Sequence, residues 1–371
     1  MRLFHLSDLH LGKQLNGFSM LEEQKYMLNQ IVNQVDSHNP DVVVIAGDVY
    51  DKSVPPTDAV ALLDDFLVRL SSRTKVFVIS GNHDSAERLA FGASLMNHSG
   101  VFISPAYNGG VSPKTLHDEF GEVDFYPLPF VRPSTVRNFF PDEEINDFTD
   151  AVRVAVGKMN IDKAKRNVVI AHQFVTADGV QIERSDSETV AVGGLDNVDA
   201  SVFDDFDYVA LGHIHGPQSV GKNTIRYCGS PLKYSFSEAP QKKGILMVEM
   251  GRKGNVETTS VPLVPLHEMR TVKGFFDDLI RQTSTDFVKI ILFDDFVPDA
   301  MSRLRDKYPN IMEMSFERNA GSQANIGKTS DVKKSPFEMF EEFFVRRSGG
   351  KEMDEKQKEF VNQLIRKIWG E

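Results

Sequence analysis

Five short polar clusters hold the residues of this chain whose types and spacing could bind metal ions. In chain order the clusters are Asp8-x-His10, Gly47-Asp48, Gly81-Asn82-His83-Asp84, His172 and Gly212-His213-x-His215. Carboxylate and amide oxygens beside imidazole nitrogens suit Mn, Fe or Zn better than Ca or Mg. Seven ligands, two Asp, one Asn and four His, are too many for one ion, which predicts two ions sharing a carboxylate.

Each cluster alone has an ordinary structural explanation. Asp8-x-His10 could be a polar strand end, Asp48 could open a loop, and His172 could be a hydrogen-bonded core histidine. His213 and His215 could be a surface pair. The order of the clusters and their shared position after apolar runs carry the prediction. His83 is left over from the ligand set, so it is free to act on a substrate, held by Asp84.

Short apolar runs that precede the clusters predict buried strands, and amphipathic segments between them predict helices. The predicted strands are Arg2–Ser7, Asp41–Ala46, Lys75–Ser80, Asn167–Ala171 and Asp207–Leu211, and the predicted helices are Met20–Ser37, Thr57–Leu70 and Ser85–Asn97. Alternation of this kind is typical of an α/β fold, which builds its site at the carboxyl ends of strands.

The second half of the chain predicts further units. Residues 1–264 read as one domain that becomes mostly β after Tyr208, with strands at Ile225–Cys228, Gly244–Met250 and Val256–Val261. Residues 265–317 predict a small α/β cap with helices Phe275–Gln282 and Pro298–Tyr308 and strands Phe287–Phe293 and Ile311–Phe316. Polar residues 318–334 predict a flexible linker, and 335–371 predict a helical hairpin with an aromatic stripe.

Composition narrows the class of protein. The 371 residues carry a formal charge of −11, which argues against a protein that coats nucleic acid, unless metals or a partner supply positive charge. The single cysteine, Cys228, is expected in the core, and no apolar run is long enough to span a membrane. We therefore expect a cytoplasmic protein; association with the nucleoid is implied only by the resemblance described below. No Gly-x-Ser-x-Gly motif and no phosphate-binding P-loop occurs.

The five clusters resemble, in order, the motifs of calcineurin-like metallophosphoesterases. The resemblance implies a two-sheet α/β sandwich flanked by helices. It also implies that one metal takes Asp8, His10, Asp48 and His215, and that the other takes Asp48, Asn82, His172 and His213. Asp48 would bridge the ions. His83 and Asp84 would then be the catalytic residues of a phosphodiester hydrolysis.

Three further segments resemble the double-strand-break repair nuclease branch of that superfamily. They are His5–Gly12, Gly47–Asp51 with Pro55-Pro56, and Tyr227–Ser235. This branch implies Mn²⁺, exonuclease action on duplex ends, endonuclease action on single strands and hairpins, and an SMC-like coiled-coil ATPase partner. It also implies a homodimer, by analogy through Thr57–Leu70 and Ser85–Asn97, that assembles with the ATPase as a heterotetramer. Archaeal relatives have a histidine where this chain has Asp51, which leaves a second substrate-handling histidine in question.

Two other functions remain open on the residues alone. A small-molecule phosphodiesterase or phosphatase would use the same ligands, and a non-catalytic scaffold would be expected to lose some of them. His5, His38, His98, His117 and His267 are expected to be structural.

Overall fold

The computed structural model describes residues 1–188, 196–317, 336–347 and 352–369. These residues divide into two compact units, Met1–Glu317 and Arg318–Glu371. The division falls where the sequence predicts the linker to begin, and residues 318–335, which include the whole predicted linker, lie outside the described residues.

Two six-stranded mixed sheets form the centre of the first unit. The first sheet runs β16 (Val256–Pro262), β15 (Gly244–Met250), β1 (Arg2–Leu6), β4 (Val42–Ala46), β5 (Lys75–Ile79), β6 (Val101–Ile103). The second runs β13 (Gln218–Val220), β14 (Lys222–Tyr227), β12 (Tyr208–Gly212), β9 (Arg166–His172), β8 (Gly121–Pro127), β7 (Lys114–Asp118). The two-sheet sandwich expected from the sequence is thereby confirmed.

Alternation of side chains along the central strands builds three apolar layers. In β4, Val42 and Val44 face the second sheet, whereas Val43 and Ile45 face the helices α1 (Leu21–His38) and α2 (Thr57–Ser71). On the far side of the second sheet, α5 (Pro133–Arg137), α6 (Phe148–Gly157) and the 3-10 turn η3 (Ala200–Phe203) cover a third core. Both faces of β4, β9 and β12 are buried, which explains their continuous apolar sequences.

The structure corrects several predicted elements. The predicted helix Ser85–Asn97 is broken into α3 (Ala86–Leu89), α4 (Ala93–Met96) and the turn η1 (Asn97–Ser99), because Gly92 adopts a left-handed φ of 75° between the two helices. The hairpin β7–β8, strand β6 and helices α5 and α6 have no counterpart among the predicted elements. Two small pairs also occur, β2 (Gln14–Leu15) with β3 (Phe18–Ser19) and β10 (Phe174–Thr176) with β11 (Asn197–Asp199).

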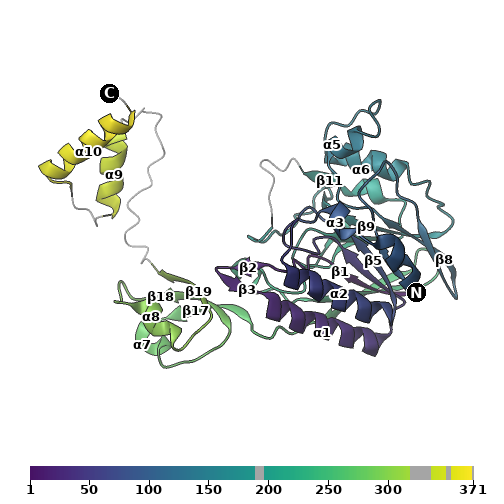
Figure 1. The fold of residues 1–371 in the computed structure, drawn as a ribbon, viewed down its shortest axis with the longest axis horizontal. Coiled ribbons are helices and arrows are strands. Elements are labelled where there is room, and N and C mark those ends of the chain that lie inside the picture. The colour runs from purple at the N-terminus through teal and green to yellow at the C-terminus, as the bar shows by residue number, and fades with distance from the viewer. Residues whose placement is uncertain (189–195, 318–335, 348–351, 370–371) are drawn as a thin grey trace. The chain divides into compact units, whose positions relative to one another are not determined.

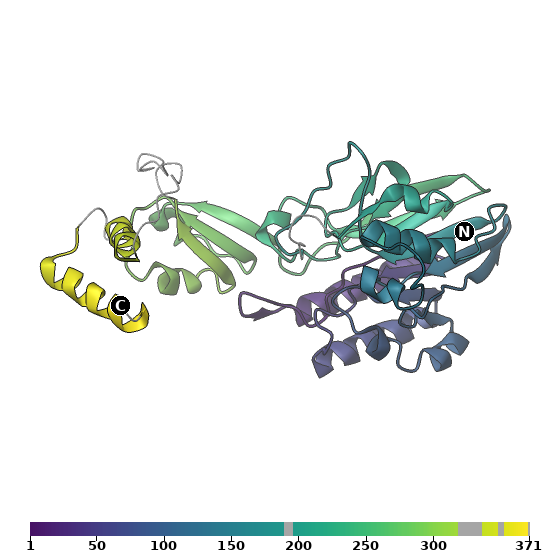
Figure 2. The ribbon, with the colours of Figure 1, turned by 90° about the horizontal axis from the view of Figure 1, so that it is seen from above.

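The cap forms its own lobe, drawn in green in Figures 1 and 2. Its parallel sheet β17 (Met269–Gly274), β18 (Phe287–Leu292), β19 (Ile311–Phe316) is covered by α7 (Phe276–Leu279) and α8 (Ala300–Arg305), both shorter than predicted. The cap packs on the first domain through the β2–β3 hairpin, where Phe18 meets Phe287 with ring centroids 6.0 Å apart. Glu23 of α1 also holds His267, with carboxylate and Nδ1 2.6 Å apart.

The second unit is a helical hairpin, α9 (Pro336–Arg347) and α10 (Glu355–Trp369). Asp354 and Gln357 bond reciprocally at the start of α10, the Asp354 carboxylate accepting from the Gln357 N–H at 2.9 Å. Lys358 and Glu341 pair across the helices at 3.4 Å.

Candidate metal centre

All seven predicted ligands meet where strands of the two sheets end. Loops after β1, β4 and β5 supply Asp8, His10, Asp48 and Asn82, and β9 and the loop after β12 supply His172, His213 and His215. Strands β1, β4 and β5 are parallel neighbours in one sheet, as β9 and β12 are in the other, so their carboxyl ends lie together. Asp8, His10, Asp48, His172 and His215 are buried.

Four of these residues have a left-handed backbone. The φ angles are 52° at Asp8, 44° at His10, 47° at Asp48 and 101° at His213. Residues with a Cβ rarely adopt positive φ, and such conformations gather at functional sites where the surrounding structure enforces them. The turns therefore serve to aim these side chains inward.

Glycines leave the room in which the ligands converge. A Cβ on Gly81 would lie 2.1 Å from Asp48 Oδ1, and one on Gly47 would lie 2.4 Å from His172 Nδ1. A Cβ on Gly212 would lie 2.0 Å from the Ala46 carbonyl oxygen. At each of these three positions a glycine therefore precedes a ligand because neighbouring atoms approach its Cα closely, as well as because of the turn geometry.

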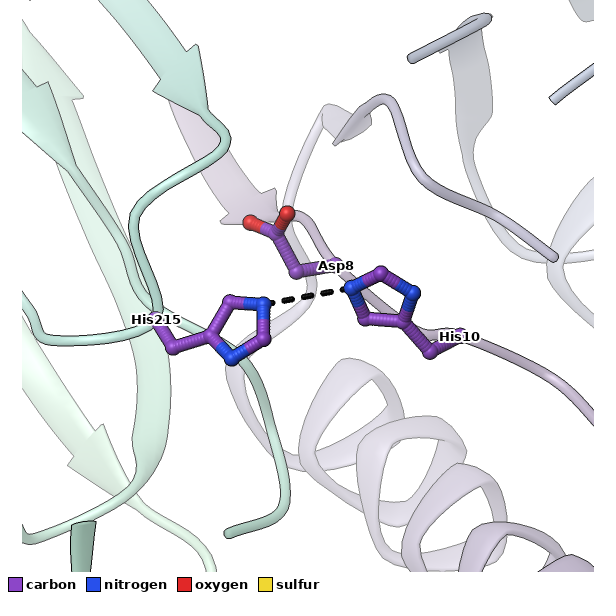
Figure 3. Close-up of side chains that lie close together, drawn as sticks. All are labelled: Asp8, His10 and His215. Carbon is purple, nitrogen blue, oxygen red and sulfur yellow. Dashed lines mark hydrogen bonds between the residues drawn. The ribbon is translucent and has the colours of Figure 1, made fainter. Parts of the chain in front are cut away.

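The first ligand group contains Asp8, His10 and His215 (Figure 3). The Nε2 atoms of His10 and His215 face each other at 3.1 Å, and Asp8 lies beside them. Two nitrogens that each lie about 2.1 Å from one ion, at roughly a right angle, are separated by about 3 Å. The observed separation therefore fits two neighbouring ligands of a single ion.

The second group gathers around Asn82 Oδ1, which lies 2.9 Å from His213 Nδ1 and 3.1 Å from His172 Nε2. Asp48 lies between the groups, with Oδ2 3.3 Å from His172 Nε2 and 3.7 Å from His10 Nε2. This position is the one that a shared carboxylate requires.

The contacts of His172 fit a bound cation. Its Nδ1 lies 2.8 Å from the Ala46 carbonyl oxygen, which can only accept, so Nδ1 carries a proton. In the neutral ring, Nε2 would then turn a lone pair toward the oxygens of Asn82 and Asp48. Only a proton or a metal ion resolves that arrangement, and histidine ligands of metals are commonly fixed by such a carbonyl contact.

The pKa values follow the same electrostatics. Burial alone would lower the pKa of His172, but the Asp48 carboxylate outweighs it and raises the pKa to about 9. Burial opposes ionisation of Asp48 too, yet His172 holds the pKa of Asp48 below its usual range. Burial lowers the pKa of His213 to about 3 and keeps the pKa of His10 well below its ordinary value, and the neutral ring that results is the form in which histidine binds a metal ion.

His83 and Asp84, the predicted catalytic pair, have contacts other than the expected one, in which Asp84 would hold His83. His83 lies at the same centre, with Nε2 3.9 Å from Asp48 Oδ2, and its Nδ1 lies 2.9 Å from the Asp51 carbonyl oxygen. The Asp84 carboxylate accepts from the backbone N–H groups of Gly81, Val49 and Tyr50 at 2.9–3.1 Å. Asp84 therefore ties the loop after β5 to the loop after β4, and the Asp51 carbonyl orients the ring of His83.

A polar network that the sequence did not predict lies behind His215. Ser187 Oγ lies 2.7 Å from His215 Nδ1, and Glu188 accepts from the His215 N–H at 2.9 Å. Glu238 lies behind both and pairs with the buried Lys243 Nζ at 2.6 Å. These residues follow no strand-end pattern, so nothing in their spacing marks them as partners of the centre.

Residues expected to be structural are placed accordingly. His5 is buried and meets the Tyr208 hydroxyl at 2.9 Å, and His117 pairs with Glu122 at 3.2 Å. Cys228 is buried beside Ser7, as expected of a core thiol. Among the described helices, none is long and apolar enough to cross a membrane.

Residues 1–217 match the family of calcineurin-like phosphoesterases, and residues 265–348 match the family described as the type 5 capsule protein repressor C-terminal domain. This chain belongs to the calcineurin-like phosphoesterases. Along most of its length it is similar to the D component of the nuclease SbcCD of Staphylococcus epidermidis, with 36% identity over 326 residues, or 85% of each chain. A solved dimetal phosphatase from Danio rerio aligns with 70% of this chain and 98% of its own at 11% identity and a TM-score of 0.38, too distant to bear on the site.

Proposed function

We propose that this chain is a DNA nuclease that uses two divalent metal ions, in the cell Mn²⁺, to hydrolyse phosphodiester bonds. The observation that carries the proposal is the convergence of the seven predicted ligands at one centre, with Asp48 between the two groups. Asp8, His10, Asp48 and His215 would hold one ion, and Asp48, Asn82, His172 and His213 the other. When bound, such ions polarise a phosphate and lower the pKa of a water molecule.

The chain's own residues would complete the reaction. His83 is partly exposed beside Asp48 and would protonate the leaving 3′ oxygen or stabilise charge that develops on the phosphate. The Asp51 carbonyl fixes the His83 ring, and Asp84 fixes the loops that carry His83 and Asp48. The Asp51 carboxylate forms an ion pair with Lys13, with Oδ1 and Nζ 2.7 Å apart.

The proposed substrates are DNA duplex ends, hairpins and single strands, cleaved by 3′–5′ exonuclease and endonuclease action. Similarity to a nuclease component along 85% of the chain supports DNA over a small phosphodiester. The chain would act as the nuclease component, SbcD, beside an SMC-like ATPase of the SbcC type, because the relative's name describes a two-component nuclease.

Exposed apolar residues support two interfaces. The hairpin presents Phe340, Phe343, Phe360 and Leu364, which we propose dock the ATPase. Around α2 to α4, Phe91 is 84% exposed and Leu95 76%, and Val60 and Val68 are also exposed. This second surface would form the homodimer, and two ATPase chains would complete a heterotetramer.

A single assay tests the proposal. Linear duplex, hairpin and single-stranded DNA, together with bis(p-nitrophenyl) phosphate, would be incubated with the protein and Mn²⁺ or Mg²⁺, with and without the ATPase. We expect Mn²⁺-dependent cleavage of DNA. Hydrolysis of the small ester without cleavage of any DNA would overturn the substrate assignment. Deleting 335–371 should preserve cleavage by the free nuclease and abolish ATPase binding.

A further inference from the structure

Two phenylalanines flank the histidines of the second ligand group. The ring of Phe130 lies with its centroid 6.4 Å from that of His172, and the ring of Phe174 lies 6.4 Å from that of His213. Both phenylalanines are only partly buried, so the apolar wall of the centre reaches the surface on these two sides.

An arginine side chain lies over the ring of each of these phenylalanines. The Arg184 guanidinium carbon lies 3.5 Å from the centroid of Phe174, and that of Arg132 lies 5.3 Å from the centroid of Phe130. Arg132 is exposed and Arg184 is partly exposed. Guanidinium groups are planar and stack on aromatic rings while their N–H edges stay available for other partners.

Neither guanidinium forms a hydrogen bond or an ion pair within the described part of the chain. Other arginines do, such as Arg73 with Asp36 and Arg166 with Asp118. On the side of the first ligand group, Lys13 lies over Tyr234 at 5.5 Å, but its charge is already paired with Asp51 at 2.7 Å. Among the described residues, Arg132 and Arg184 therefore place unpaired positive charge beside the second ligand group.

Resting on the proposed function, we propose that Arg132 and Arg184 bind the backbone phosphates that neighbour the scissile phosphate and so select a nucleic-acid strand over a small phosphodiester. A chain of formal charge −11 gives a polyanion no general attraction, so local cations must supply it. One arginine guanidinium can donate two parallel hydrogen bonds to two oxygens of a phosphate. Such contacts set the position of a nucleic-acid strand without reading its sequence.

A stack of arginine on phenylalanine can also be purely structural. In the cap, Arg303 lies 4.2 Å from the centroid of Phe276. That stack is of the same type but has no metal-ligand histidine against its ring, which makes Arg303→Gln a matched control for Arg132→Gln and Arg184→Gln.

The test compares the wild type, Arg132→Gln, Arg184→Gln, the double variant and Arg303→Gln. Binding of a fluorescein-labelled oligonucleotide in EDTA, measured by anisotropy at several salt concentrations, reports on the arginines without metal or turnover. We expect each single variant to bind about tenfold more weakly. The slope of log affinity against log salt should fall by about 0.7–0.9 per arginine. Steady-state assays with Mn²⁺ should show a higher KM for the oligonucleotide and an unchanged kcat/KM for bis(p-nitrophenyl) phosphate.

Five results would overturn the inference. The double variant could bind DNA with wild-type affinity and salt slope, or Arg303→Gln could weaken binding as much. Equal losses on DNA and on the small ester would mean that the arginines act through the metal ligands. If the wild type cleaves no DNA at all, the proposed function fails and this inference fails with it. If the wild type cleaves DNA and the double variant does so with unchanged KM, this inference alone fails.

Discussion

His10 and His215 are 205 residues apart in the chain, yet their Nε2 atoms face each other at 3.1 Å. One ring follows a strand of the first sheet and the other follows a strand of the second. The centre therefore exists only when the two sheets are packed together. Variants of a ligand, of the backbone near it and of the supporting polar network should each have a different effect.

Replacing Asp48 by Asn should abolish activity. The amide keeps the shape of the side chain but removes the charge that both ligand groups share. Metal-ion catalysis contributes several kcal/mol, so we expect a loss of about 1,000-fold or more in kcat/KM. Metal content by mass spectrometry should fall in parallel. Full activity in this variant would remove Asp48 from the centre.

Replacing His83 by Gln should separate chemistry from metal binding. The ring faces the centre from the side of Asp51 and lies outside the proposed ligand set. We expect kcat to fall by roughly 10²–10⁴-fold, as is typical for a general acid. The rise in Tm on adding Mn²⁺ should match that of the wild type. Loss of that rise would instead make His83 a ligand.

Gly81→Ala should displace the bridging carboxylate. The new methyl group would meet Asp48 Oδ1 at 2.1 Å and the Asp48 backbone nitrogen at 2.4 Å, so Asp48 has to move. We expect the affinity for Mn²⁺, measured by calorimetry, to fall at least tenfold. Gly157→Ala is the control, because a Cβ there would meet nothing within 4 Å and stability should change by less than about 1 kcal/mol.

Lys243→Met should destabilise the fold by about 3–5 kcal/mol, because it leaves the Glu238 carboxylate buried without its cation. Urea unfolding measures the change. The matched variant Lys222→Met removes an exposed partner of Asp204 and should cost less than about 1 kcal/mol. Similar losses in both variants would mean that burial of Glu238 has little influence on stability.

The ionisation of Asp118 should make the free energy of unfolding depend on pH. The Arg166 guanidinium holds the pKa of Asp118 below its usual value in the folded chain. A lowered pKa contributes stability above the unfolded value of about 4, and that contribution is lost as the pH falls through the folded pKa. Asp118→Asn should therefore be less stable than the wild type at pH 7, and the gap should narrow below about pH 4. A gap independent of pH would exclude the charge as its cause.

The sequence predicted the centre better than it predicted the fold around it. The positions of Asp8, Asp48 and His172 were predictable because each lies at or just after the end of a largely apolar strand that is buried on both faces, and such runs are unambiguous. Strand β7, whose pattern Lys114–Asp118 is polar and half-exposed, gave no such run. The helix across Gly92 failed because apolar spacing does not reveal a backbone that turns left-handed.

The supporting network was beyond sequence reasoning for a different reason. Ser187 lies in a turn, Glu238 ends a 3-10 helix and Lys243 directly precedes β15, and only the packing of these segments brings the three residues behind His215. Local pattern carries no information about such contacts. The same holds for Arg132 and Arg184, which lie in segments with no periodicity.

Strand β1 lies between β4 and β15, and β15 is made of residues 244–250. During synthesis, β1 can pair with β4 early, but its other edge has no partner until the ribosome has reached β15. At about 5–20 residues per second, that edge waits for roughly 10–50 seconds. A nascent chain thus exposes an apolar, hydrogen-bonding strand edge for most of its translation, and such an unpaired edge is prone to aggregation. Metal loading is expected to follow completion of this sheet.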